Sequence, residues 1–104
     1  MGRALTIGLG GLLLAACGRD PAPDDAVARG RTVYLAQCTA CHASDPALPG
    51  PVGPPLRGAS RALLEAKVVR GAYPPGYTPR RQTALMVPLP QLAASIDDLA
   101  AFLR

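Results

Sequence analysis

The segment Cys38-Thr39-Ala40-Cys41-His42 is the part of the sequence that decides how the chain folds. Two cysteines three positions apart, followed at once by a histidine, form the pattern to which haem is attached covalently. One helical turn between the cysteines places both sulfur atoms on the same side, where each can add to a haem vinyl group. The neighbouring imidazole then points at the iron. The segment therefore predicts one covalently bound haem c, with the fold built around it.

Two other interpretations of the same cysteines are open. A redox-active dithiol would be expected in a thioredoxin-like context, but the flanking sequence has no alternation of strands and helices. A structural zinc site needs four ligands. Besides Cys38, Cys41 and His42, the chain offers only Cys17 as a further cysteine, and it has no second histidine.

The first sixteen residues are expected to be a targeting segment. Arg3 supplies the positive charge, and the apolar run over residues 4–16 is too short to span a bilayer as a helix. Leu14-Ala15-Ala16-Cys17 resembles the cleavage box of bacterial lipoproteins, in which the cysteine becomes the acylated N-terminus. The resemblance implies a signal peptide over residues 1–16 and lipidation of Cys17. An ordinary secretory signal cut nearby is the alternative.

Lipidation of Cys17 implies an exported chain, anchored on the periplasmic side of a bacterial membrane. Gly18 follows the cysteine, not the aspartate that often retains lipoproteins at the inner membrane, so the inner and the outer membrane both stay open. Residues 17–25 are polar and contain prolines, and they are expected to form a tether of up to about 25 Å. Residues 26–104 then form one small domain.

Three helices are expected in this domain, with no confident strand, so the fold class is all-α. The first covers residues 25–37, favoured at its start by acidic residues, with Val27, Gly30, Tyr34 and Cys38 on one stripe. The second covers residues 61–70, capped by Ser60 and ended by Gly71, and the third opens at Ser95 with a capping-box pattern. Loops rich in proline and glycine, residues 43–58 and 73–90, separate them.

Gly30, Tyr34 and Cys38 follow one another at intervals of four residues, and Leu99 and Phe102 form a Leu-x-x-aromatic pair in the last helix. With these residues, positions 26–104 resemble the class I c-type cytochromes. In that family the terminal helices cross closely at the glycine, and the aromatic residues pack there. The resemblance implies a cytochrome c-like fold: three to four short helices wrapped around one covalent haem, with proline- and glycine-rich loops.

The resemblance also implies ligands for the iron. Once residues 1–16 are removed, Met86 is the only methionine and His42 the only histidine. Class I cytochromes place their ligand methionine in a proline-containing loop before the last helix, as Met86 stands here, although a lone methionine is usually core filler. The family often has proline directly after this methionine, whereas this chain has Val87 and then Pro88.

Gly53-Pro54-Pro55-Leu56 matches a Gly-Pro-x-Leu segment of the family, in which a backbone carbonyl accepts a hydrogen bond from the ligand histidine. Pro54 is therefore expected as the acceptor and Leu56 as a haem contact, with a plain proline-rich surface loop as the alternative. Cations and hydroxyl groups suit buried carboxylates. Candidates to bind the haem propionates are accordingly Tyr73, Tyr77, Arg61 and Arg81.

Two filled axial positions leave no place for a substrate, so the expected activity is one-electron transfer between redox proteins, without enzymatic activity. A basic region would favour partners with acidic docking surfaces, although it could also be a solvated helix face. Nucleic acid is not expected as a partner of an exported chain. Two other functions stay open: an open-site haem protein for a small gas or peroxide, and a haem subunit of a larger respiratory or dehydrogenase complex. The basic region comprises Arg57, Arg61, Lys67, Arg70, Arg80 and Arg81, against only Glu65.

Overall fold

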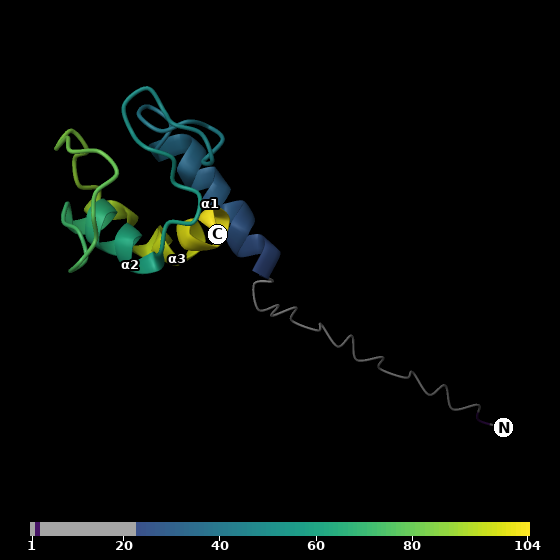
Figure 1. Ribbon diagram of the computed structural model, residues 1–104. Helices are drawn as coiled ribbons and strands as arrows, with labels where there is room; N and C mark the ends of the chain where they lie inside the picture. The colour runs from purple at the N-terminus through teal and green to yellow at the C-terminus, as the bar shows by residue number, and fades with distance from the viewer. Residues whose placement is uncertain (1, 3–22) are drawn as a thin grey trace.

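The computed structural model describes residues 2 and 23–104, and in this part of the chain it contains helices and no strands (Figure 1). The all-α class expected from the sequence is confirmed for these residues. The predicted signal peptide, except Gly2, and the predicted lipidation site Cys17 lie outside them. None of the described helices is long and apolar enough to cross a membrane. In chain order the elements are α1 (Pro23–Gln37), α2 (Arg61–Leu64), η1 (Glu65–Val69), η2 (Pro90–Ser95) and α3 (Ile96–Leu103).

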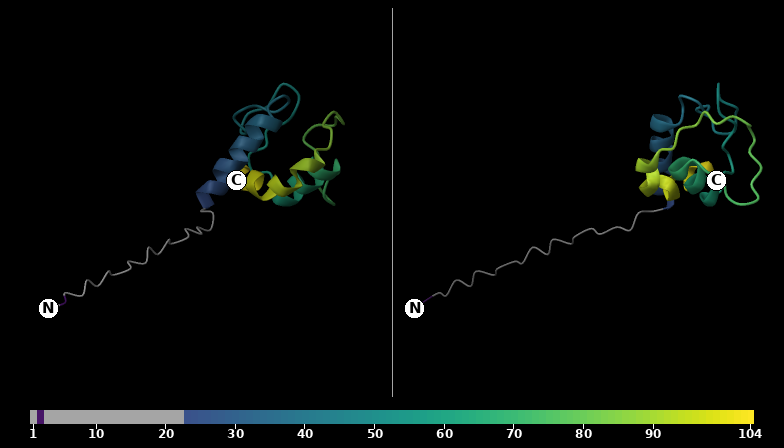
Figure 2. Two further views of the ribbon diagram at one scale, coloured as in Figure 1. Left: turned by 180° about the vertical axis from the view of Figure 1, so that it is seen from behind. Right: turned by 90° about the vertical axis from the view of Figure 1, so that its left-hand side faces the viewer.

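Helices α1 and α3 cross closely at Gly30 (Figure 2). A Cβ atom at this glycine would overlap the backbone carbonyl of Asp98 and come within 2.9 Å of the Phe102 Cβ. Beside the crossing, the rings of Tyr34 and Phe102 pack with their centroids 5.4 Å apart. Arg29 donates two hydrogen bonds to the Asp98 carboxylate, at 2.9 and 3.0 Å. The crossing expected at the glycine is therefore present.

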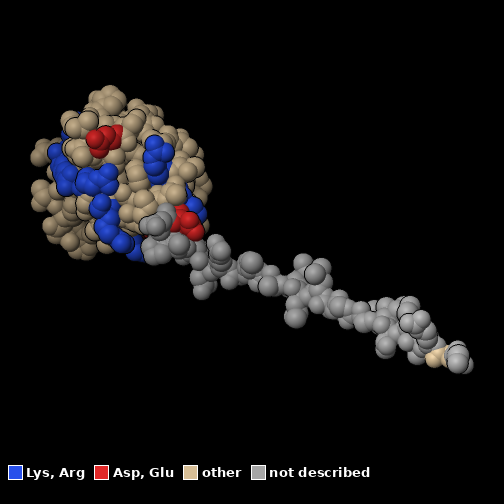
Figure 3. Space-filling view, turned by 90° about the vertical axis from the view of Figure 1, so that its right-hand side faces the viewer, with Lys and Arg blue, Asp and Glu red and all other residues tan. Residues whose placement is uncertain are grey.

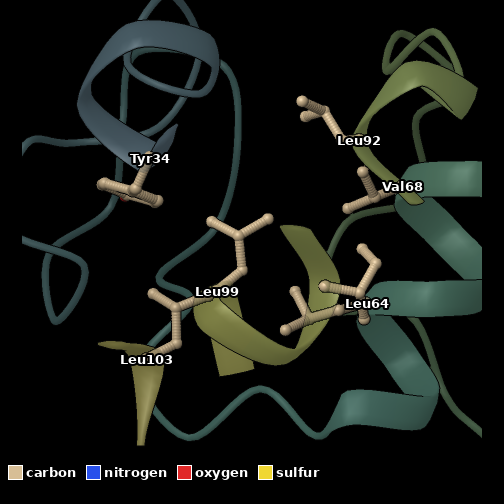
Figure 4. Packing of buried hydrophobic residues seen from close by; sticks show 7 residues of the cluster. Tyr34, Leu64, Val68, Leu92, Leu99 and Leu103 are labelled. Carbon is tan, nitrogen blue, oxygen red and sulfur yellow. The ribbon is translucent and has the colours of Figure 1, made fainter. Parts of the chain in front are cut away.

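The buried side chains of the helical elements form one apolar core (Figure 4). Val27 was expected on one stripe with Gly30, and its side chain at the start of that stripe is 41% exposed. The reason is that α1 meets α3 at Gly30, one turn farther along the helix. The core consists of Tyr34, Leu64, Val68, Leu92, Ile96, Leu99 and Leu103.

Both predicted ends of the second helical segment are confirmed. The Ser60 hydroxyl accepts a hydrogen bond from the backbone N–H of Leu63 at 3.1 Å, so the serine caps the N-terminus. At the other end Gly71 adopts a φ of 66°, a left-handed conformation that favours glycine. Its backbone N–H donates to the carbonyl of Lys67 at 3.1 Å, which closes the helix.

Two helical segments differ from the α-helices that were expected. The second segment changes from α2 into a π-helical turn, η1, in which Ala66 and Val68 are buried. The third begins with the 3-10 turn η2, and Pro90 occupies its first turn. Ser95 therefore already has helical dihedral angles, and its side chain makes no capping hydrogen bond. The capping-box prediction at Ser95 is wrong because the chain enters α3 from an existing helical turn.

Candidate functional site

The segment containing both cysteines continues directly from α1 as a hydrogen-bonded turn. The backbone N–H of Cys38 donates to the Tyr34 carbonyl at 2.9 Å, and the N–H of His42 donates to the Cys38 carbonyl at 2.9 Å. The Tyr34 hydroxyl donates to the Ala43 carbonyl at 2.5 Å, which fixes the chain just beyond the turn. Tyr34 thus joins the helix crossing to the position of the cysteines and the histidine.

The two cysteines have different surroundings. Neither is in a disulfide. Cys38 is half-buried, and burial raises the pKa of its thiol to about 11, so the free side chain is a neutral thiol at neutral pH. Cys41 is exposed.

His42 is buried. Its ring is held in place by residues 50–56, a segment that does not contain His42 but contacts it, and that we call the His42 loop. Its Nδ1 atom lies 2.9 Å from the Pro54 carbonyl oxygen, the hydrogen bond expected from the sequence. Because a carbonyl oxygen only accepts, Nδ1 donates in this contact, and in the neutral imidazole the lone pair then lies on Nε2. Gly53 lies against the ring, where a Cβ atom would overlap the imidazole.

A cavity opens beside His42, in two adjoining parts of about 110 and 240 Å³. Seven residues line both parts of the cavity, and most of them are apolar. They are Cys41, His42, Leu56, Leu64, Val68, Leu85 and Met86. Cys38 and Tyr34 line the larger part, and Pro54 lines the smaller. The structure thus brings the six residues expected to bind a cofactor to one cavity: Cys38, Cys41, His42, Pro54, Leu56 and Met86.

Met86 reaches this cavity from the segment that we call the Met86 loop (residues 73–89). Its side chain is partly buried and packs against the core. The neighbouring side chains of Leu85 and Val87 are 67% and 72% exposed. All three consecutive residues line the cavity, and the methionine is the least exposed of them. After it, the backbone N–H of Leu89 donates to the Val68 carbonyl at 2.6 Å, which returns the loop to η1.

The smaller part of the cavity has a polar edge. Tyr73 and Tyr77 stack with ring centroids 5.4 Å apart, and the Lys67 ammonium lies 4.5 Å from the Tyr73 centroid. Arg80 and Arg81 line the same part. Tyr73, Tyr77 and Arg81 were among the propionate candidates, and the structure places all three here.

Arg61, the fourth propionate candidate, does not line the cavity and instead pairs with Asp97 at 2.5 Å. Because its partner comes from α3, Arg61 is engaged away from the cavity in this structure. Lys67 and Arg80 were assigned only to the basic region, although both line the cavity. The signal that could have placed Lys67 is its i, i+4 spacing from Leu63, which also lines the cavity.

No protein-family model, no curated protein and no solved structure matches the chain. Among residues 2 and 23–104, no three or more His, Cys, Asp and Glu side chains group so as to hold a metal ion. What these residues offer is one imidazole and one thioether on a common cavity, with two cysteine sulfurs beside the imidazole.

Proposed function

We propose that the chain is a monohaem c-type cytochrome of the class I kind, with the cytochrome c-like fold, and that it carries single electrons between redox proteins. The observation that carries the proposal is the convergence of the candidate haem ligands and contacts on one cavity. They come from the end of α1, the His42 loop and the Met86 loop, which are far apart in the sequence.

The residues of the cavity fit a covalently attached haem. His42 can bind a metal through Nε2, because its Nδ1 donates to the Pro54 carbonyl and the lone pair of the neutral imidazole then lies on Nε2. Cys38 and Cys41 are both free to form thioether bonds. Met86 lines both parts of the cavity, as His42 does, so these two residues would hold the iron. When bound, the haem would supply an iron able to take one electron from a redox partner and to give it to another.

The surrounding residues would tune this site. The hydrogen bond from His42 to the Pro54 carbonyl fixes the ring orientation and makes Nε2 a stronger donor to a metal. A thioether ligand such as Met86 favours the reduced metal and gives a comparatively high potential. Leu56, Leu64 and Val68 keep the interior of the cavity apolar. With His42 and Met86 both used as ligands, no open position remains for a substrate, which is why we propose a carrier and not an enzyme.

The partner of such a carrier would have an acidic docking surface. Lys67, Arg80 and Arg81 lie on the polar edge of the cavity. Lys and Arg side chains also outnumber acidic ones on the face shown in Figure 3. A positive surface of this kind attracts acidic proteins and raises their encounter rate. The lipid on Cys17 would keep the domain on the periplasmic side of a bacterial membrane.

An absorption spectrum of the complete chain, matured in a haem-attaching host, tests the proposal. We expect pigment that resists acid–acetone extraction, a low-spin spectrum and the methionine-to-iron band. Met86→Ala should abolish that band, and Leu48→Ala, which changes an exposed leucine that lines neither part of the cavity, should keep it. Extraction of all the pigment, or a band that survives in M86A, would overturn the assignment. Rapid binding of carbon monoxide by the reduced protein would instead indicate an open site.

A further inference from the structure

Two arginines of the Met86 loop bind the His42 loop directly. The Nη1 atom of Arg80 donates to the Pro55 carbonyl at 2.7 Å, and that of Arg81 donates to the Val52 carbonyl at 3.3 Å. These two acceptors stand on either side of Pro54, whose carbonyl accepts the hydrogen bond of His42. The arginines therefore connect the loop that carries one candidate ligand to the segment that orients the other.

Apart from the packing of the Met86 side chain against the core, the other contacts described between the Met86 loop and η1 lie at the two ends of the loop. Near the start, Tyr73 packs under the Lys67 ammonium, and at the finish the N–H of Leu89 donates to the Val68 carbonyl. In the described structure, the only hydrogen bonds that join the middle of this loop to another segment are those of Arg80 and Arg81. The loop is otherwise without helix or strand until η2, as its trace in Figure 2 shows.

We propose that Arg80 and Arg81 are positioning residues that hold the Met86 loop closed, and that they set how often Met86 leaves the iron. This inference rests on the proposed function. A segment fixed only at its ends samples many conformations, and contacts in its middle remove that freedom. Opening the loop would require both arginine bonds to break, each made by a charged donor. The closed arrangement holds the His42 loop as well, because the same bonds reach the residues around Pro54.

The rate at which carbon monoxide binds to the reduced holoprotein measures this opening. At saturating carbon monoxide, the observed rate equals the rate at which Met86 leaves. We expect the double variant Arg80→Gln, Arg81→Gln to bind about tenfold faster than the unaltered protein, as the loss of hydrogen bonds from charged donors predicts. Arg70→Gln is the matched control, because Arg70 pairs with Glu65 at 2.9 Å and does not line the cavity. It should bind at the unaltered rate.

The alternative role of these arginines is to bind only the haem carboxylates. In that case the double variant would change the midpoint potential and its pH dependence, while carbon monoxide would bind at the rate of the R70Q control, and the proposal would be overturned. If the double variant does not fold, Arg81→Gln alone removes the longer bond and should still accelerate binding. A failure of the proposed function itself is distinguishable, because the unaltered protein would then lack the methionine-to-iron band.

Discussion

Replacement of Gly30 by alanine tests the helix crossing on which the fold depends. A methyl group at this position would overlap the backbone carbonyl of Asp98, and backbone cannot move aside as a flexible side chain can. Overpacking of this kind costs about 3 kcal/mol. The higher helix propensity of alanine stabilises the folded protein by about 1 kcal/mol relative to glycine. The net loss of stability is therefore about 2 kcal/mol, which lowers the melting temperature by about 10 °C in a domain of this size.

Guanidinium unfolding of the holoprotein, followed by circular dichroism, measures this loss. Arg31→Ala is the control, because Arg31 is an exposed residue of the same helix and its replacement leaves the crossing unchanged. We expect R31A to unfold close to the unaltered protein and Gly30→Ala to unfold at clearly lower denaturant. A G30A protein as stable as the unaltered chain, or more stable, would refute the close crossing, since only the helix-favouring term would then remain.

Three further changes follow from individual contacts. Gly53→Ala places a methyl group on the His42 ring, so under the proposed function it should reduce the yield of low-spin haem protein in the absorption spectrum. Ser60→Ala removes a helix cap and should lower the free energy of unfolding by about 1 kcal/mol in denaturant titrations. The hydrogen bonds from Arg29 hold the pKa of Asp98 below its ordinary value. Their stabilisation is therefore complete above about pH 4 and is lost as the pH falls through the lowered pKa, and Asp98→Asn should remove this part of the acid dependence.

Each of these changes has an outcome that contradicts its reasoning. A G53A protein with the spectrum and yield of the unaltered chain would mean that the His42 loop does not press on the ring. An S60A protein of undiminished stability would mean that the second helical segment needs no cap. If D98N and the unaltered protein lose stability equally below pH 4, other carboxylates carry the acid dependence.

The features that the sequence predicted correctly are those set by local spacing. Gly30 and Phe102 stand at positions where two helices can approach, and Ser60 and Gly71 have the side chains that begin and end a helix. The crossing at Gly30 and the hydrogen bond between His42 and Pro54 were expected from the family resemblance, through short segments that match its patterns. Only the two ends of the second helical segment were expected from the residues themselves, Ser60 and Gly71.

The features that were missed depend on partners distant in the sequence. Arg61 was expected at the cavity, but it pairs with Asp97 of α3, and its own neighbours give no sign of this. Ser95 has the pattern of a helix cap, yet the chain reaches it already wound into η2. The carbonyl partners of Arg80 and Arg81 were not predicted either, because every residue has a backbone carbonyl and no known pattern marked Val52 and Pro55 as the acceptors of these side chains.

These backbone acceptors explain how loops without regular structure can hold a site in place. Proline has no N–H to donate, and its ring fixes φ, so Pro54 and Pro55 stiffen the loop and add carbonyl acceptors without adding donors. Its carbonyl oxygens are then available to other segments. Pro54 uses its carbonyl for His42, and Pro55 uses the next one for Arg80. Two consecutive carbonyl groups of one stiff segment thus accept hydrogen bonds from His42 and from Arg80 of the Met86 loop. Movement of the Met86 loop and orientation of the His42 ring should therefore be coupled through the peptide bond that joins these prolines.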